Sequence, residues 1–279
     1  MPPSVTQQHI DDYARDGAVL IKGLFADHVD DIIAGIAMNM DSPGPYAAEN
    51  LRPGEAGRFF DDYCNWQRIP AFEKVIRQSA VADVAADLMA SQTVQLFHDH
   101  VLVKEPGTAK ATPWHQDSPY YFFGGQQTVS FWCPVDPVGM ATLRCVAGSH
   151  KWPRPVLPTR WLAEDTFYPN ESDWMPVPDP DAEGMRVLEW PMEPGDAVAF
   201  DFRVLHGARG NDSPVRRRAF SLRLVGDDAR FVTRPGRTSP PFPGHDMVAG
   251  DRLRDDWFPI LLDRSRDTVP MTKDASADA

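Results

Sequence analysis

Apolar and polar residues alternate along much of the second half of the chain, and this pattern limits the folds that it can adopt. Five segments show this period of two, at residues 94–104, 128–135, 186–190, 196–206 and 217–225. Each segment is bounded by Gly, Pro, Asp or Asn, and no helical pattern separates them. Short strands without intervening helices predict antiparallel sheets packed as a sandwich or a barrel.

The first third of the chain has a helical pattern instead. We expect a helix over residues 6–15, a second helix over 29–40 with Asp27 as its N-cap, and a third over 71–89. Between the first two, the segment 17–23 is apolar and bounded by glycines, which indicates a short buried strand. These elements are expected to support the β region.

Length and composition indicate one folded domain. The chain has 279 residues, of which 42% are hydrophobic and 24% charged, as in ordinary globular proteins. We expect a single domain over residues 1–270. It would comprise a helical N-terminal part (1–92), a β core (93–226) and a C-terminal extension (227–270), followed by a flexible tail at 271–279.

The charge balance limits the choice of partners. Lys and Arg total 28 against 40 Asp and Glu, so the net charge is −12, which disfavours nucleic acid and anionic membrane surfaces. No apolar run is long enough for a spanning helix, and the first residues lack the pattern of a signal peptide. We therefore predict a cytoplasmic protein with a small-molecule substrate, without nucleic-acid or membrane partners. The oligomeric state is left open.

One short motif carries metal-binding chemistry. His115 and Asp117 are separated by one residue, so in an extended segment their side chains point to the same side. Such a triplet is common by chance, and a third ligand is needed. His206 is the candidate, because it ends the alternating segment 196–206 on its apolar face. A histidine there is more often a core residue, but two histidines and one carboxylate form the facial triad of non-haem Fe(II) oxygenases.

The last of the five segments carries a second polar group. Alternation places on one face, in order, Arg217, Ala219, Ser221 and Arg223. A guanidinium beside small residues leaves room for a ligand carboxylate bound as a bidentate pair. The neighbouring Arg216 and Arg218 are expected to be solvated.

Together these motifs resemble the phytanoyl-CoA dioxygenase (PhyH) family of Fe(II)- and 2-oxoglutarate-dependent oxygenases. The resemblance spans residues 7–226. Its ordered matches are YARDGAVLIKGL (13–24), KEPG (104–107), TPWHQD (112–117), the strand ending at Trp132, VAGSH (146–150) and HGARGN (206–211). It implies a mainly β fold, the double-stranded β-helix or cupin-like jelly-roll barrel, with N-terminal and flanking α-helices.

The same resemblance implies the cofactors. His115, Asp117 and His206 correspond to the iron ligands, and Arg217 corresponds to the partner of the distal carboxylate of 2-oxoglutarate. The expected reaction uses Fe(II), 2-oxoglutarate and O2 to hydroxylate an unactivated C–H bond of a metabolite, with release of succinate and CO2.

Other cosubstrate contacts follow in the same way. Trp132 and His100 fall where the family has residues beside 2-oxoglutarate, and Ser221 shares the face of Arg217. Ala208 stands where the family often has a serine, so one hydroxyl contact is expected to be missing. His150, in the Gly-Ser-His turn, is expected to be structural.

The predicted substrate pocket is largely aromatic. Its residues are Tyr120, Tyr121, Phe122, Arg144 and Arg203. The aromatic and proline-rich segment 151–191 is expected to cover the mouth of the barrel. Aromatic walls suit either an apolar molecule or a quaternary amine. A coenzyme A thioester is disfavoured, because its phosphates require a basic pocket mouth and this chain is acidic.

Two alternatives remain compatible with the pattern. One is a jelly-roll enzyme that uses another metal for hydrolysis or isomerisation, and the other is a jelly-roll binding protein without catalysis. Neither needs a buried guanidinium at the position of Arg217. That residue favours the oxygenase.

Overall fold

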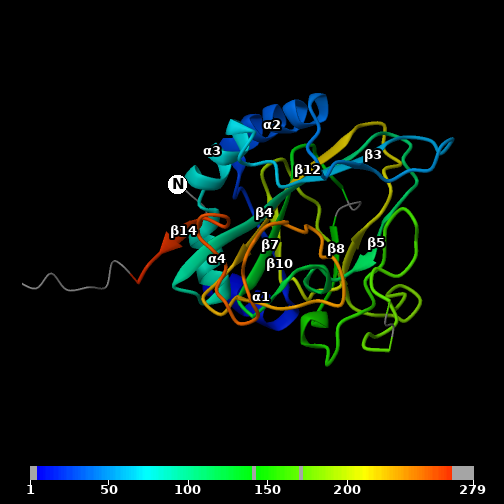
Figure 1. Cartoon of the computed structure of the whole chain (residues 1–279). Helices are drawn as coiled ribbons and strands as arrows, with labels where there is room; N and C mark the ends of the chain where they lie inside the picture. The colour runs from blue at the N-terminus through cyan, green and yellow to red at the C-terminus, as the bar shows by residue number, and fades with distance from the viewer. Residues whose placement is uncertain (1–4, 140–142, 170–171, 266–279) are drawn as a thin grey trace, which may run out of the picture.

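Two antiparallel sheets form the centre of the molecule (Figure 1). The computed structural model describes residues 5–139, 143–169 and 172–265. The large, eight-stranded sheet has the order β1 (Ala18–Ile21), β10 (Ala197–Phe200), β7 (Thr128–Pro134), β12 (Arg217–Val225), β4 (Thr93–Lys104), β3 (Phe59–Tyr63) and β2 (Ala48–Glu49), with β14 (Ile260–Asp263) also paired to β4. The predicted mainly β, antiparallel architecture is confirmed.

The smaller sheet has four strands. Their order is β5 (Thr112–His115), β11 (His206–Ala208), β8 (Leu143–Val146) and β9 (Val187–Leu188). A separate pair joins β6 (Phe123–Gly124) to β13 (Arg230–Phe231). Trp132, Phe200 and Ala219 of the large sheet pack with Leu143 and Cys145 of the small one, so the two sheets share an interior.

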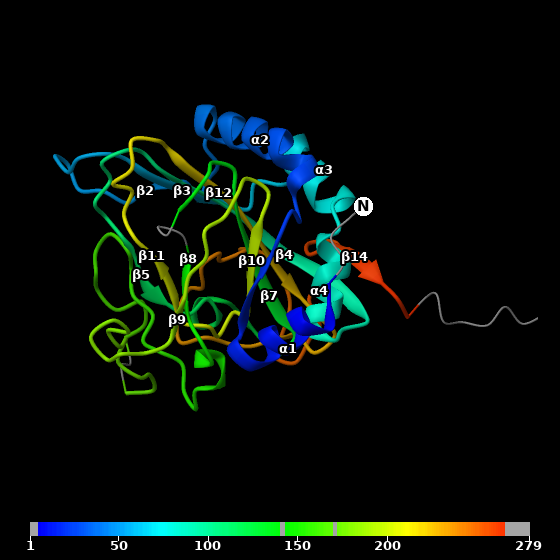
Figure 2. The ribbon, with the colours of Figure 1, turned by 180° about the vertical axis from the view of Figure 1, so that it is seen from behind.

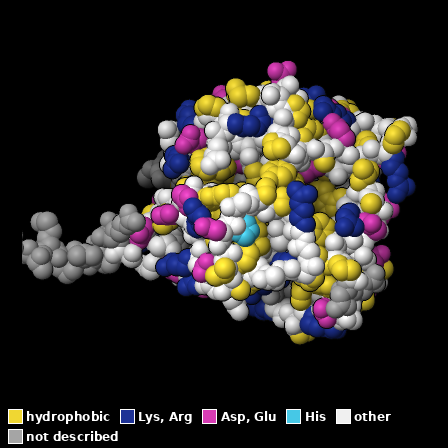
Figure 3. Space-filling view, viewed as in Figure 1, with side chains coloured by type: hydrophobic (Ala, Val, Ile, Leu, Met, Phe, Trp, Pro, Cys, Tyr) yellow, Lys and Arg dark blue, Asp and Glu magenta, His cyan; other side chains and the backbone are white. Residues whose placement is uncertain are grey.

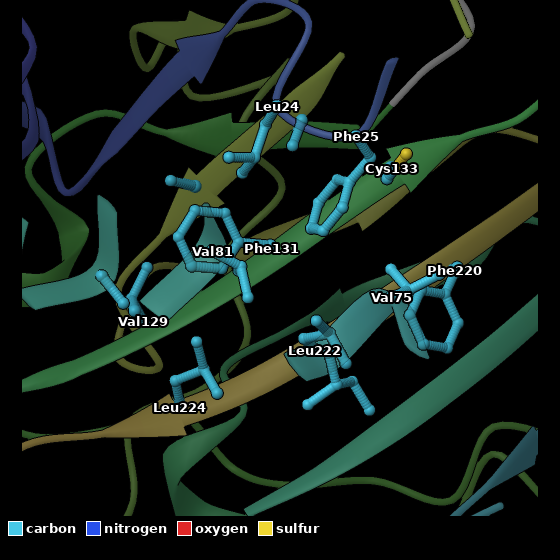
Figure 4. Close-up of a cluster of buried hydrophobic side chains, with 14 of the residues drawn as sticks. Leu24, Phe25, Val75, Val81, Val129, Phe131, Cys133, Phe220, Leu222 and Leu224 are labelled. Atoms are coloured by element: carbon cyan, nitrogen blue, oxygen red, sulfur yellow. The ribbon is translucent and has the colours of Figure 1, made fainter. Parts of the chain in front are cut away.

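The other face of the large sheet is covered by helices. Those of the described chain are α1 (Gln7–Asp16), α2 (Val29–Asp41), α3 (Pro70–Gln78) and α4 (Val81–Met89). Figure 2 shows the same arrangement from behind, with α2 and α3 side by side. In Figure 4, Phe131, Phe220 and Leu222 of β7 and β12 meet side chains of these helices. Burial of this apolar layer fixes the helices on the sheet.

The helices follow the sequence pattern with two corrections. Helix α1 follows a capping box formed by Thr6 and His9, so its start agrees with the expected helix over 6–15. Asp27 is not an N-cap, because it lies in a 3-10 turn, η1 (Ala26–His28), that precedes α2. The expected helix over 71–89 is two helices, because the backbone leaves the helical region at Ser79.

The segment 196–206 is a second departure from the prediction. It is not one strand, because β10 ends at Phe200 and β11 begins at His206 in the other sheet. Between them the amide of Val204 donates to the carbonyl of Asp201, and the amide of Arg203 donates to the Asp201 carboxylate. Asp201 therefore builds an Asx turn that moves the chain from one sheet to the other.

The parts expected on either side of the β core contribute to its large sheet. Strands β1, β2 and β3 come from residues 1–92, and β14 comes from 227–270. The division into parts with these boundaries stays a prediction, and the tail at 271–279 lies outside the described residues.

Acidic and basic side chains are interspersed on the face of the molecule seen in Figure 3, with hydrophobic groups between them. Within the described residues, no helix is both long and apolar enough to cross a membrane. The cytoplasmic location stays a prediction.

Candidate metal centre and adjoining cavity

Pairing between β5 and β11 brings two distant histidines together. His115 is the last residue of β5 and lies opposite His206, the first residue of β11. Their ring centroids are 4.1 Å apart. Asp117 follows where the chain turns into η2 (Ser118–Tyr120). The three side chains are buried, and their potential ligand atoms all lie within 4.8 Å of one another.

The backbone sets the direction of both imidazoles. Nδ1 of His115 lies 2.8 Å from the carbonyl of Pro113, and Nδ1 of His206 lies 3.0 Å from that of Val204. A carbonyl only accepts, so Nδ1 carries the proton in each ring and Nε2 has the lone pair. Burial, reinforced by the neighbouring His115, lowers the pKa of His206 to about 3. This ring is therefore neutral and able to bind a metal.

The carboxylate of Asp117 presents one oxygen to both rings. Its Oδ1 lies 3.6 Å from Nε2 of His115 and 3.7 Å from Nε2 of His206. Its Oδ2 accepts from the Ser130 hydroxyl at 3.0 Å and lies 3.3 Å from Nε of Arg223. Burial by itself would raise the pKa of Asp117, but the charged guanidinium of Arg223 holds it well below its usual range.

This donor set fits a divalent iron ion. Two imidazole nitrogens and one carboxylate oxygen converge from one side, and each has its other polar atom fixed by the protein. Such outer contacts orient metal ligands and hold the tautomer. Their identity as iron ligands stays a prediction. His150 lies apart, in η3 (Ser149–Lys151), packed against Gly17, where a side chain would collide with its ring.

A cavity of about 410 Å³ opens beside this cluster. Its walls combine aromatic with polar and charged side chains. The lining includes His115 and Asp117, the predicted Tyr120 and Tyr121, and also Tyr46, Tyr63, His98, His100, Trp161, Phe167 and Arg223. Thr159, Arg160 and Leu162 come from the segment 151–191, which therefore forms part of the wall.

Three predicted pocket residues lie elsewhere. Phe122 packs on Phe97 behind the cavity wall, with ring centroids 5.3 Å apart. Arg144 pairs with Asp181 and stacks over Trp114. Arg203 pairs with Asp201 and lines a different hollow of the surface. Their aromatic or basic character suggested a pocket role, but other contacts hold them away from the cavity: aromatic packing for Phe122, the Asp181 pair for Arg144 and the turn at Asp201 for Arg203.

The predicted cosubstrate residues occupy one face of the large sheet. His100, Ser221 and Trp132 form one row across β4, β12 and β7, and Lys104 pairs with Arg217 further along. The Arg217 guanidinium donates to the carbonyl of Arg209 at 2.8 Å. Burial lowers the pKa of Arg217 to about 10, so it is charged at neutral pH.

Ser221 and His100 also have polar contacts within the protein. The Ser221 hydroxyl donates to the carbonyl of Phe131 at 2.6 Å. His100 lines the cavity and contacts Asp61. The structure thus brings Arg217, Trp132 and Ser221 to one sheet face and His100 to the cavity wall. Their role toward 2-oxoglutarate stays a prediction.

Several cavity residues had no assigned role in the sequence. Arg223 shares a strand face with Arg217, and this alternation was the available signal. Asp61 and Tyr63 belong to β3, a strand with no clear alternating pattern. Trp161 lies in an irregular segment, where no local pattern reports which loop residue folds inward.

A family model described as phytanoyl-CoA dioxygenase (PhyH) matches residues 13–219. A curated protein of Caenorhabditis elegans named "probable phytanoyl-CoA dioxygenase" is 28% identical over 178 residues, which cover 61% of this chain. The matched region spans about half, 55%, of that relative's length.

Solved structures share the fold. The non-haem α-ketoglutarate-dependent carbocyclase SnoK matches with a TM-score of 0.72 and 23% identity, over 92% of this chain and 96% of its own. The epimerase SnoN matches with a TM-score of 0.74 and 21% identity, over 91% of this chain and 97% of its own. EctD from S. alaskensis was solved with 2-oxoglutarate and 5-hydroxyectoine. It matches with a TM-score of 0.66 and 17% identity, over 90% of this chain and 86% of its own. These likenesses confirm the predicted jelly-roll fold.

Proposed function

Because the chain belongs to the phytanoyl-CoA dioxygenase family, we propose that it hydroxylates an unactivated C–H bond of a small-molecule metabolite, using Fe(II), 2-oxoglutarate and O2 and releasing succinate and CO2. Membership supports an enzyme of the 2-oxoglutarate-dependent dioxygenase class. The observation that carries the proposal is the buried cluster of His115, Asp117 and His206, whose donor atoms converge within 4.8 Å.

Each ligand has a defined contribution. Nε2 of His115, Nε2 of His206 and Oδ1 of Asp117 would hold the iron on one side and leave its other positions open. The carbonyls of Pro113 and Val204 keep the imidazole protons on Nδ1. Bound together, iron and 2-oxoglutarate supply the activation of dioxygen, in which the oxo acid is oxidised to succinate and CO2 and one oxygen atom enters the substrate C–H bond.

The chain also provides the means to orient the cosubstrate. Arg217 would bind the distal carboxylate of 2-oxoglutarate, because its guanidinium is charged and buried on the sheet face shared with Ser221 and Trp132. A planar guanidinium binds a carboxylate through two parallel hydrogen bonds.

The cavity supports a small-molecule substrate. Its volume of about 410 Å³, and its combination of aromatic side chains with a few charged and polar ones, are typical of ligand pockets. Trp161 packs edge to face on His115, with ring centroids 5.1 Å apart, and would keep bulk water from the iron side. The structures of SnoN and EctD contain the small molecules nogalamycin RO and 5-hydroxyectoine.

Iron-dependent decarboxylation of 2-oxoglutarate tests the proposal directly. Purified protein with Fe(II), ascorbate and 2-oxoglutarate should form succinate slowly without a substrate and faster with a correct one. Mass spectrometry of a metabolite mixture should then reveal products 16 mass units heavier than their parents. If iron-loaded protein neither bound 2-oxoglutarate nor turned it over, a binding protein without catalysis would be favoured instead.

A further inference from the structure

A carboxylate and an imidazole form a pair in the cavity wall, away from the proposed iron ligands. Oδ2 of Asp61 lies 3.0 Å from Nε2 of His100, and Oδ1 of Asp61 accepts from the amide of Asn50 at 2.5 Å. All three residues are more than nine-tenths buried and line the cavity. The pair joins β3 to β4 by a diagonal contact across their shared register.

The pair leaves one nitrogen for a ligand. An ionised carboxylate only accepts, so the proton of a neutral His100 ring resides on Nε2 and its Nδ1 carries the lone pair. No residue of the described chain forms a hydrogen bond to this Nδ1, and the ring lines the cavity. Each oxygen of Asp61 already has one donor, whereas Nδ1 of His100 has none among the described residues, so the imidazole is the acceptor of this pair without a partner.

Aromatic rings frame this acceptor. The ring of Trp161 is stacked at 6.5 Å from that of His100 and at 24° to it, while Tyr63 meets His100 edge-on at 5.5 Å. The ring of Trp161 also contacts that of His115, with ring centroids 5.1 Å apart. One indole therefore spans the distance from the acceptor to the proposed iron site.

We propose that the Asp61–His100 pair is a substrate subsite that accepts a hydrogen bond from a hydroxyl group on a flat ring. The ring packs against Trp161, and the hydroxyl donates to Nδ1 of His100. This contact directs one side of the ring to the iron site. The inference rests on the proposed function, and it assigns His100 to the substrate rather than to 2-oxoglutarate.

Matched probes test the acceptor. The probes are 2-naphthol, its methyl ether, which lacks the donor, and (2-naphthyl)trimethylammonium, which is a cation. Their affinities are measured by tryptophan fluorescence or ligand NMR, with metal-free protein and with protein loaded with Zn(II) and 2-oxoglutarate. We expect wild type to bind the naphthol about 3- to 10-fold more tightly than the ether, the range of one net hydrogen bond.

Variants locate the preference. His100→Leu should bind naphthol and ether equally, while its affinity for 2-oxoglutarate changes less than twofold. Asp61→Asn should also weaken the preference, because an amide can donate to Nε2 and move the proton to Nδ1. Tyr63→Phe is the matched control in the same wall, since its hydroxyl contacts Ser239 instead, and it should keep the preference.

Three outcomes overturn the inference. The first is equal binding of naphthol and ether by wild type, or no binding of any probe. The second is tighter binding of the ammonium, which would mean that the subsite selects cations. The third is a tenfold loss of 2-oxoglutarate affinity in His100→Leu with the naphthol preference retained. Metal and 2-oxoglutarate binding by wild type are measured on the same samples, so failure of the proposed function is recognised separately.

Discussion

Nε of Arg223 lies 3.3 Å from Oδ2 of Asp117, and this contact determines which carboxylate oxygen faces the two histidines. Ser130 donates to the same Oδ2, so Oδ1 alone points to both Nε2 atoms. Arg223 is itself held by the hydroxyls of Tyr121 and Ser221. The guanidinium therefore acts as a positioning group that favours binding of the metal through one carboxylate oxygen.

We predict that Arg223→Met destabilises the metal-free protein more than the metal-loaded protein. Removal of one partner of a buried ion pair typically costs about 3–5 kcal/mol, because the other charge is left uncompensated. A bound divalent ion would supply the missing positive charge beside Asp117. Urea unfolding with and without Zn(II) measures both values.

Arg218→Met is the control for Arg223, because Arg218 pairs with Asp136 nearer the surface. It should lower the free energy of unfolding by about 1 kcal/mol or less, equally in both states. An equal loss with and without metal in Arg223→Met would show that Arg223 stabilises the fold without acting on Asp117.

Stoichiometric Fe(II) binding should require His115, Asp117 and His206 together. Replacing any one by alanine leaves two ligands, which is too few to hold the ion on one side. Elemental analysis after anaerobic loading gives the iron content, and circular dichroism checks folding. His150→Ala should keep its iron. Full iron content in His206→Ala would remove the assignment.

Arg217→Lys should raise the KM for 2-oxoglutarate about 10- to 100-fold and leave iron affinity nearly unchanged. Lysine lacks the planar guanidinium, and a charge-assisted hydrogen bond contributes about 1.5–3 kcal/mol. Succinate formation against 2-oxoglutarate concentration provides the measurement.

The neighbours of Arg217 are suitable controls, since Arg216 pairs with Glu105 and Arg218 with Asp136. Lysine at either position should leave the KM within about twofold, because neither pair involves the buried sheet face. A large effect at Arg218 instead of Arg217 would move the cosubstrate to the opposite face of β12.

Lys104 should make stability depend on pH. Burial, followed by the positive charges of Arg217 and Lys110, lowers its pKa from 10.5 to about 6. Between these values the unfolded chain binds the proton and the folded chain does not, so this group increases the free energy of unfolding as pH rises. The maximum slope is about 1.4 kcal/mol per pH unit.

Lys104→Met should flatten this slope between pH 6.5 and pH 8.5 in urea unfolding. Lys74→Met is the matched control, because Lys74 is half-exposed and paired with Asp31, and it should keep the slope of wild type. An unchanged slope in Lys104→Met would mean that the lysine is charged in the folded protein.

Features that depend on local pattern could be predicted from the sequence. The strand 217–225 was predicted within its true bounds, so alternation correctly placed Arg217, Ser221 and Arg223 on one face. The His-x-Asp motif and its ordered neighbours identified the family. These inferences succeeded because side-chain direction in a strand follows from residue spacing alone.

Contacts between distant groups could not be predicted in this way, because they depend on the packing of the whole chain. His206 was expected at the end of one long strand, whereas the Asx turn at Asp201 carries it into the other sheet and places it opposite His115. The contacts of Arg223 with Asp117, of Asp61 with His100 and of Trp161 with His115 join different elements. Each depends on which strands pair and how a loop packs, and these are set by burial of the whole core rather than by any local spacing.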